Sequence, residues 1–187
     1  MEKSPAILLR RTKLTDTSLI VTWCTKSHGI VKTVAKGALR PKSPFAGRLD
    51  LFFNAEIIWI PSRKSDLHTL SDAHLIDPRL GIRRNYIQTL AAGYFCDCLS
   101  QAAETDTPIN DLYDLLHRAL DFLASQDVSP KAIHYFERQL AIALGIAESI
   151  PDTTSSAPHQ RIYLALADHL PRIPTQRKEL DRSLNLE

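Results

Sequence analysis

The sequence predicts an α+β fold, with a five-stranded N-terminal barrel over residues 1–77 and an all-α helical bundle domain over residues 78–187. Apolar and β-branched residues alternate up to residue 76, a pattern typical of strands. From Asp77 onward the apolar period becomes about 3.6, which is typical of amphipathic helices. Positive charge is also concentrated in the barrel part. These observations indicate a first domain that binds polyanions and a second domain with a different role.

Five short apolar runs predict the strands, and they occupy residues 6–12, 18–25, 29–37, 51–60 and 67–76. A closed barrel has no exposed strand edges, so a five-stranded oligonucleotide-binding (OB) barrel is the simplest arrangement. Trp23 and Trp59 are in phase with the inward faces and are predicted core residues. Phe45 lies between two strands, where it is either an exposed aromatic or a plug over the barrel end.

Three predicted helices begin with a capping residue followed by proline, at Asp77-Pro78, Thr107-Pro108 and Ser129-Pro130. An apolar stripe follows each of them, and Gly145 is expected to end the third helix in a left-handed conformation. Gly93, inside the first helix, predicts a close contact with another helix or with the barrel. Three similar helices favour a bundle.

The last part of the chain is predicted to be a linker-like loop at residues 148–158, followed by two further helices. The first of these carries an apolar stripe up to Pro171, and the second covers residues 175–184.

The stretch from residue 32 to residue 50 is cationic and contains no acid before Asp50. Residues 1–48 hold ten Lys and Arg against two acids, whereas the remainder of the chain has a net charge of −6. The cations therefore form a local patch on a strand end and a loop, where binding chemistry usually lies. The patch contains Lys32, Lys36, Arg40, Lys42 and Arg48.

The rest of the composition indicates an ordinary soluble chain. Three cysteines without a CxxC motif favour a reduced, cytoplasmic compartment over a disulfide framework. The N-terminus does not resemble a signal peptide, and no window approaches a membrane span. No histidine or cysteine pair has further ligands at metal spacing, and no P-loop, GxSxG or dinucleotide motif is present. We therefore expect no catalytic residues, no metal and no cofactor.

The segment LRRTKLTDTSLIVTWCTKSHGIVKTVAKGALRPKSPFAGRLDLF resembles the N-terminal signature of the bacterial recombination and repair family RecO. The resemblance is carried by Ala35-Lys36-Gly37, by Arg40-Pro41-Lys42-Ser43 and by Gly47-Arg48-Leu49 at this spacing. It continues more weakly through residues 78–84, 132–145 and 164–180.

This resemblance implies an OB barrel, a helical domain and no enzymatic activity. It implies binding to single- and double-stranded DNA, annealing of complementary strands, and partnership with RecR and with the acidic, apolar tail of single-stranded DNA-binding protein (SSB). Indirectly it implies loading of RecA, and association with the nucleoid. The expected DNA-binding residues are Arg10, Arg11, Lys32, Lys36, Arg40, Lys42 and Arg48.

The sequence departs from the family pattern in two places. Many relatives have a four-cysteine zinc site behind the third helix, but no cysteine follows Cys98 here, so we expect no zinc. Leu39 stands where the family usually has a second cation, which puts one DNA contact in doubt.

Two function classes remain open at this point. The first is a DNA-binding recombination mediator, and the second is a helical adaptor whose basic loop docks an acidic partner tail. A third hypothesis, an enzyme on an OB scaffold, lacks candidate residues. An SSB-tail site needs an apolar pocket rimmed by cations. The expected cations are Arg138, Arg172, Arg177 and Lys178, and the alternative reading of these residues is ordinary surface charge.

Overall fold

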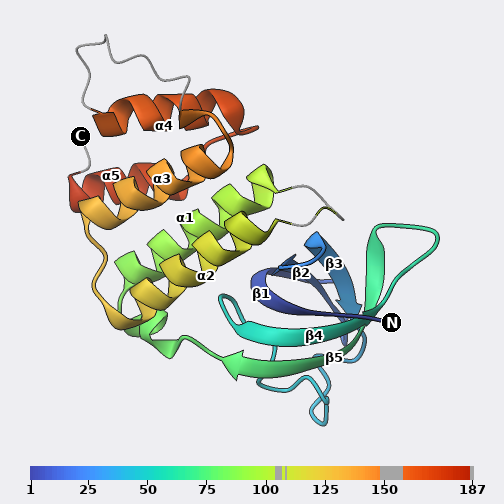
Figure 1. The fold of residues 1–187 in the computed structure, drawn as a ribbon. Helices are drawn as coiled ribbons and strands as arrows, with labels where there is room; N and C mark the ends of the chain where they lie inside the picture. The colour runs from blue at the N-terminus through green and yellow to red at the C-terminus, as the bar shows by residue number, and fades with distance from the viewer. Residues whose placement is uncertain (104–106, 108, 148–157, 186–187) are drawn as a thin grey trace. The chain divides into compact units, whose positions relative to one another are not determined.

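The computed structural model describes residues 1–103, 107, 109–147 and 158–185. Its N-terminal part is a closed barrel with the strand order β1-β2-β3-β5-β4 (Figure 1). Neighbouring strands are antiparallel except β3 and β5, which pair in parallel. This is the predicted OB arrangement. The strands are β1 (Glu2–Lys13), β2 (Leu19–Thr25), β3 (Gly29–Ala35), β4 (Asn54–Ile60) and β5 (Leu67–Asp77).

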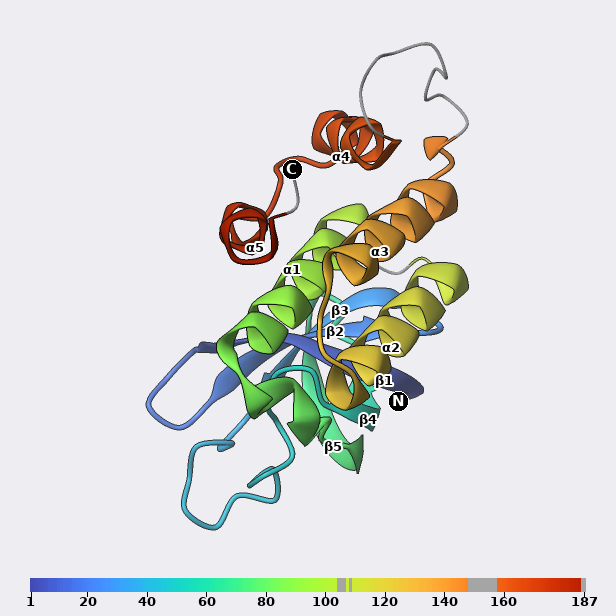
Figure 2. The same cartoon turned by 90° about the vertical axis from the view of Figure 1, so that its left-hand side faces the viewer.

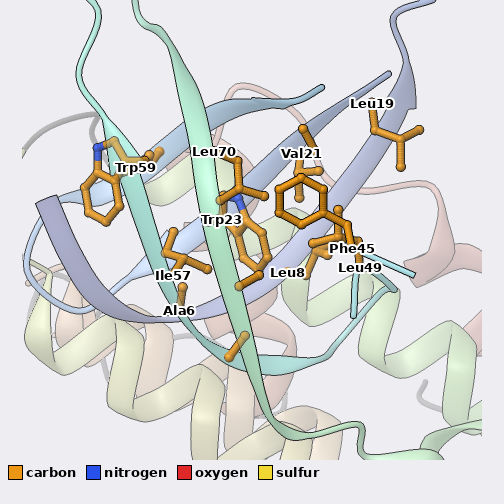
Figure 3. Packing of buried hydrophobic residues seen from close by; sticks show 14 residues of the cluster. Ala6, Leu8, Leu19, Val21, Trp23, Phe45, Leu49, Ile57, Trp59 and Leu70 are labelled. Carbon is orange, nitrogen blue, oxygen red and sulfur yellow. The ribbon is translucent and has the colours of Figure 1, made fainter. Parts of the chain in front are cut away.

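The barrel interior is filled by the alternating apolar residues of all five strands (Figure 3). Trp23 and Trp59 are almost completely buried in it, as the alternation predicts. The indole of Trp23 donates a hydrogen bond of 2.9 Å to the hydroxyl of Thr33 on β3, so its polar atom is satisfied inside the core. Phe45 is also buried in this cluster, and it is therefore the plug rather than the exposed aromatic.

The second part of the chain is helical, and Figure 2 shows α1, α2 and α3 side by side. The stacked rings of Phe95 and Phe136 join α1 to α3, with centroids 3.8 Å apart. The helices are the 3₁₀ helix η1 (Leu80–Arg84), α1 (Tyr86–Ala102), α2 (Asn110–Ser125), α3 (Pro130–Ala143), α4 (Pro158–His169) and α5 (Gln176–Leu184).

The predicted helix start at Asp77-Pro78 is wrong. Asp77 is still paired with Asn54 of β4, so β5 continues through it. Its carboxylate accepts a hydrogen bond of 2.8 Å from the backbone N–H of Arg79, which forms a turn instead of a helix cap. The long helix α1 begins only after η1, where the Asn85 side chain accepts a hydrogen bond from the N–H of Gln88.

The third predicted helix start is confirmed. The Ser129 side chain accepts a hydrogen bond from Ala132, and Pro130 is the first residue of α3. Gly145 follows α3 with φ of 70°, the left-handed conformation expected there. The second helix begins at Asn110, three residues after the predicted cap Thr107, and Pro108 lies outside the described residues. Residues 148–157 of the predicted linker also lie outside them.

The chain forms two compact units. One contains Met1–Arg79 and the described part of Ala103–Tyr113, and the other contains Leu80–Ala102 and the described residues from Asp114 onward. The expected domain boundary after residue 77 stays a prediction. No helix among the described residues has the length and apolar character needed to cross a membrane.

A buried amide connects α1 to the segment between α2 and α3. The Gln88 side chain is fully buried and donates hydrogen bonds of 2.7 Å to the carbonyl oxygens of Leu123 and Gln126. It also accepts one of 2.7 Å from the N–H of Val128. These bonds satisfy backbone groups at the end of α2 and directly after it, which have no partner inside the helix.

A buried ion pair between α3 and α5 also contacts α1 and α4 of the same unit. Glu137 on α3 accepts a hydrogen bond of 2.8 Å from the Tyr94 hydroxyl on α1 and one of 2.6 Å from the Arg177 guanidinium on α5. Arg177 also pairs with Asp181, and its guanidinium lies 4.8 Å from the ring centroid of Tyr163 on α4. Burial, together with the neighbouring Cys98 and Glu137, raises the pKa of Tyr94, so its hydroxyl keeps its proton.

Replacing Gly81 by alanine should destabilise the helical unit by at least 1–3 kcal/mol, about the cost of overpacking a core. A Cβ atom at Gly81 would overlap the backbone carbonyl of Ala124, which cannot move as a side-chain end could. The matched control is Gly93→Ala, whose Cβ would lie 3.6 Å from the Gln176 side chain in ordinary contact. Urea denaturation should show Gly93→Ala at least as stable as the parent, and equal losses for both variants would contradict this packing.

Replacing Arg177 by methionine should lower the free energy of unfolding by about 3–5 kcal/mol, because Glu137 would remain buried without its cation. Lys178→Met is the control, since the neighbouring Lys178 is exposed and its loss should change stability by less than about 0.5 kcal/mol. Thermal and urea unfolding of both variants measure the difference. Equal stability of the two would show that the ion pair does not support the helical unit.

Candidate nucleic-acid interface

The connection between β3 and β4, residues 36–53, carries most of the predicted DNA-binding residues. It is a series of turns rather than an extended loop, with backbone hydrogen bonds from Arg40 to Gly37, from Ser43 to Arg40 and from Arg48 to Phe45. Gly37 has φ of 69°, a left-handed conformation that allows the chain to turn directly after β3. The sequence therefore folds this connection into a compact, defined shape.

Two apolar residues fix the β3–β4 connection to the barrel. Phe45 and Leu49 insert into the barrel core and retain only 7% and 6% of their exposure (Figure 3). Lys32 on β3 and the cations between β3 and Phe45 remain outside: Lys32, Lys36, Arg40 and Lys42 are all exposed. An apolar underside thus holds a cationic outer surface on a rigid scaffold.

These four cations have no carboxylate partner among the described residues. Their charge is therefore available to a ligand, and Arg40 can bind a phosphate through two parallel hydrogen bonds. Arg10, at the end of the buried part of β1, is also exposed.

Two other predicted DNA-binding residues have structural partners. Arg11 pairs with Asp50 at 3.1 Å and donates a hydrogen bond of 3.1 Å to the carbonyl of Leu49. Arg48 lies 3.4 Å from the Asp72 carboxylate and 3.4 Å from the carbonyl of Ala73 on β5. Both guanidiniums attach the β3–β4 connection to strands, a role that the charge pattern of the sequence did not reveal.

The barrel offers little for base stacking. Every Phe and Trp side chain in residues 1–79 is buried, including Phe52 and Phe53 next to β4. On the outer face of β2 and β3, Thr22 rather than an aromatic residue stands opposite Lys32. The exposed groups of this surface therefore suit phosphates, which carry no sequence information, better than bases.

The described residues contain no group of three or more His, Cys, Asp or Glu that could hold a metal ion. The three thiols are buried, and burial raises the pKa of Cys24 to about 12. Such a thiol stays protonated near neutral pH and is a poor nucleophile.

The helical unit contains one feature that the sequence did not reveal, an apolar groove between α1, α2 and α3. Its volume is about 440 Å³, and Phe122 and Tyr135 in its wall are 42% and 60% exposed. Two exposed cations, Arg118 and Lys131, belong to its lining. The full lining is Phe95, Leu115, Arg118, Ala119, Phe122, Ser129, Lys131, Ala132, Tyr135 and Phe136.

The four predicted partner-binding cations differ in burial, and three of them are exposed while one is buried. Arg138, Arg172 and Lys178 are exposed, but none of them lines the groove. Arg177 is 4% exposed and is held by Glu137 and Asp181, so it is not an available surface charge. The groove draws its residues from separated helices, which explains why local sequence pattern did not indicate it.

Two family descriptions match the chain: "Recombination protein O N terminal" over residues 1–79 and "Recombination protein O C terminal" over residues 83–157. The chain belongs to the RecO family. The first match coincides with the barrel and its basic connection, and the second begins inside η1.

Curated relatives agree with this assignment. A protein from Rhodopirellula baltica named "DNA repair protein RecO" is 33% identical over 75% of this chain and 52% of its own length. A protein with the same name from Bifidobacterium longum is 31% identical over 75% of the chain and 60% of its own length. Another from Listeria monocytogenes is 29% identical over 78% of the chain and 56% of its own length. The chain thus spans a little over half the length of these relatives.

Proposed function

We propose that this chain is a non-enzymatic mediator of DNA repair and recombination that binds single- and double-stranded DNA. The observation that carries the proposal is the exposed cationic surface of Lys32, Lys36, Arg40 and Lys42 on an OB barrel of the RecO family. These four side chains have no carboxylate partner in the part of the chain that the structure describes. Such a surface neutralises successive phosphates and releases their counterions. Its residues suit phosphate binding rather than bond cleavage, which supports a role without catalysis.

Strand annealing is consistent with the same surface. Two complementary strands repel each other through their phosphates, and bound cations reduce that repulsion. Because the aromatic side chains of the barrel are buried, bases need not stack on the protein and stay free to pair. Partnership with RecR and assistance in loading RecA complete the proposal and are supported by the family relationship, as is a location in the cytoplasm at the nucleoid.

Neutralising the basic connection with Lys36→Gln, Arg40→Gln and Lys42→Gln should weaken binding to a single-stranded oligonucleotide. The slope of log affinity against log salt should become shallower by about 2.1 if each cation contacts one phosphate. Fluorescence anisotropy between low and physiological salt measures this slope, and an annealing assay measures the activity.

The control for this triple variant removes the same charge from Lys3, Lys13 and Arg182, each of which has a carboxylate partner. It should bind and anneal as the parent does. If the triple variant at the basic connection binds and anneals DNA as well as the parent, the assignment of this surface fails, and the adaptor hypothesis takes its place.

We further propose that the groove of the helical unit receives the SSB tail. An acidic tail with apolar side chains needs an apolar cavity rimmed by cations, and the groove combines Phe122 and Tyr135 with Arg118 and Lys131. This position replaces the one expected near Arg138 and Arg177, because Arg177 is engaged inside the protein.

Charge reversal of Arg118 and Lys131 to Glu should weaken binding of a synthetic SSB-tail peptide by about tenfold or more, since two attractions become repulsions. Isothermal titration with the folded variants gives the affinity. The matched variant carries Arg138→Glu and Arg172→Glu, which lie outside the groove and should leave the affinity nearly unchanged. The opposite order of effects would return the site to the residues expected from sequence.

A further inference from the structure

Two leucines are exposed beside the cations of the β3–β4 connection. Leu39, inside the connection, is 47% exposed, and Leu14, in the turn between β1 and β2, is 46% exposed. Ala38, the neighbour of Leu39, packs against the barrel core, so the connection turns one apolar side chain inward and the next one outward. Phosphate binding does not use either leucine.

The two leucines belong to loops at the same end of the barrel (Figure 2). Lys13, the last residue of β1, is opposite Leu19, the first residue of β2. Leu19 is in turn opposite Ala35, the last residue of β3. The β1–β2 turn and the β3–β4 connection therefore begin next to each other.

Hydrogen bonds join the two loops and fix their shape. The N–H of Leu39 donates a hydrogen bond of 2.9 Å to the carbonyl of Thr17, and the N–H of Gly37 donates one of 3.2 Å to the hydroxyl of Ser18. Within the turn, the N–H of Leu14 donates one of 3.0 Å to the carbonyl of Ser18. Because the backbone under both leucines is already ordered, a ligand loses less free energy in ordering it on binding.

The surroundings of Leu39 are cationic. The three cations nearest to it in the connection are exposed and have no carboxylate partner among the described residues, and they are Lys36, Arg40 and Lys42. Asp16 is the acid of the β1–β2 turn, and Lys13 already pairs with it at 2.8 Å. The charge on this end of the barrel therefore favours a ligand with carboxylates.

Apolar side chains next to such cations favour a protein ligand of one kind. Phosphates use only the cations of this surface. A protein segment with Asp or Glu next to Leu, Ile or Phe uses the leucines as well, because its apolar side chains leave water when they contact Leu14 and Leu39. Its carboxylates then form charge-assisted hydrogen bonds with the cations.

We propose that Leu14 and Leu39, together with the cations of the β3–β4 connection, bind an acidic protein segment that carries apolar side chains, and that this segment and DNA exclude each other. The inference rests on the proposed function and adds a regulation of the same site, because the same cations serve both ligands. Each ligand lowers the affinity for the other by the same factor. The site belongs to the barrel unit and is distinct from the groove proposed for the SSB tail.

Displacement of a fluorescent single-stranded oligonucleotide from the full chain tests this proposal. The competitors are a short synthetic peptide of Asp and Leu residues and an all-Asp peptide of the same charge. Both should displace the oligonucleotide, and the Asp–Leu peptide should do so at a concentration about tenfold lower, because it also buries apolar surface on the two leucines.

Two variants separate the leucines from the cations. Leu39→Lys adds a cation and removes apolar surface, so it should steepen the log–log salt slope of oligonucleotide binding by about 0.7. It should also reduce the advantage of the Asp–Leu peptide over the all-Asp peptide. Leu14→Ser with Leu39→Ser should remove that advantage and change oligonucleotide affinity by less than about twofold, because it leaves every cation in place.

The matched control replaces two exposed leucines of the helical unit, Leu80→Ser with Leu164→Ser. These side chains are 64% and 52% exposed, so the control removes at least as much exposed apolar surface from elsewhere in the chain. It should change neither oligonucleotide affinity nor the advantage of the Asp–Leu peptide. Circular dichroism confirms that each variant is folded.

The outcomes distinguish this inference from the proposed function. If the parent binds the oligonucleotide but both peptides displace it equally, the leucines bind no apolar segment, and the inference is overturned while the proposed function stands. The same holds if neither peptide displaces the oligonucleotide, or if Arg118→Glu with Lys131→Glu abolishes displacement, since the peptide then acts from the helical unit. A parent that binds no oligonucleotide overturns both.

Discussion

The parallel contact between β3 and β5 is the constraint on which the barrel depends. Only three residue pairs form it, from Lys32 with Leu67 to Val34 with Thr69, yet it closes the sheet. Parallel neighbours cannot be joined by a tight hairpin, so the chain must cross the barrel end after β3 and return as β4 before it reaches β5. The 36–53 connection is the result of that crossing. The cations of this connection therefore lie where the strand order of the closed barrel requires the chain to cross.

Charge in the barrel unit is used in two ways. Arg11 and Arg48 pair with acids and with backbone carbonyls, and they attach the β3–β4 connection to the barrel strands at the surface. Phe45 and Leu49 attach it from inside the barrel core. Exposed ion pairs of this kind contribute at most about 1 kcal/mol each, so the buried apolar anchors carry more of the stability. Lys32, Lys36, Arg40 and Lys42 have no carboxylate partner within the described residues, which is why they are the cations proposed to contact a ligand.

Sequence pattern predicted the barrel well because strand alternation is local: the inward positions of Trp23 and Trp59 follow from a period of two. It failed at Asp77, where pairing with Asn54 extends β5 and overrides a helix-start signal. It identified the cations of the basic connection but not which of them have carboxylate partners. Those partners are distant in sequence: Asp50 follows Arg11 by 39 residues, and Asp72 follows Arg48 by 24. The groove in the helical unit required three helices to be assembled, so no local pattern could indicate it.

The buried Glu137 has a consequence for the order in which the chain acquires its structure during synthesis. Its guanidinium partner, Arg177, follows it by 40 residues. The barrel strands all precede residue 78 and can close while the ribosome is still translating the helices. The helical unit cannot complete its packing this early, because α3 would have to bury the Glu137 carboxylate without its cation until α5 has left the ribosome. Nascent chains halted before α5 should therefore hold a folded barrel and an unfinished, protease-sensitive helical unit.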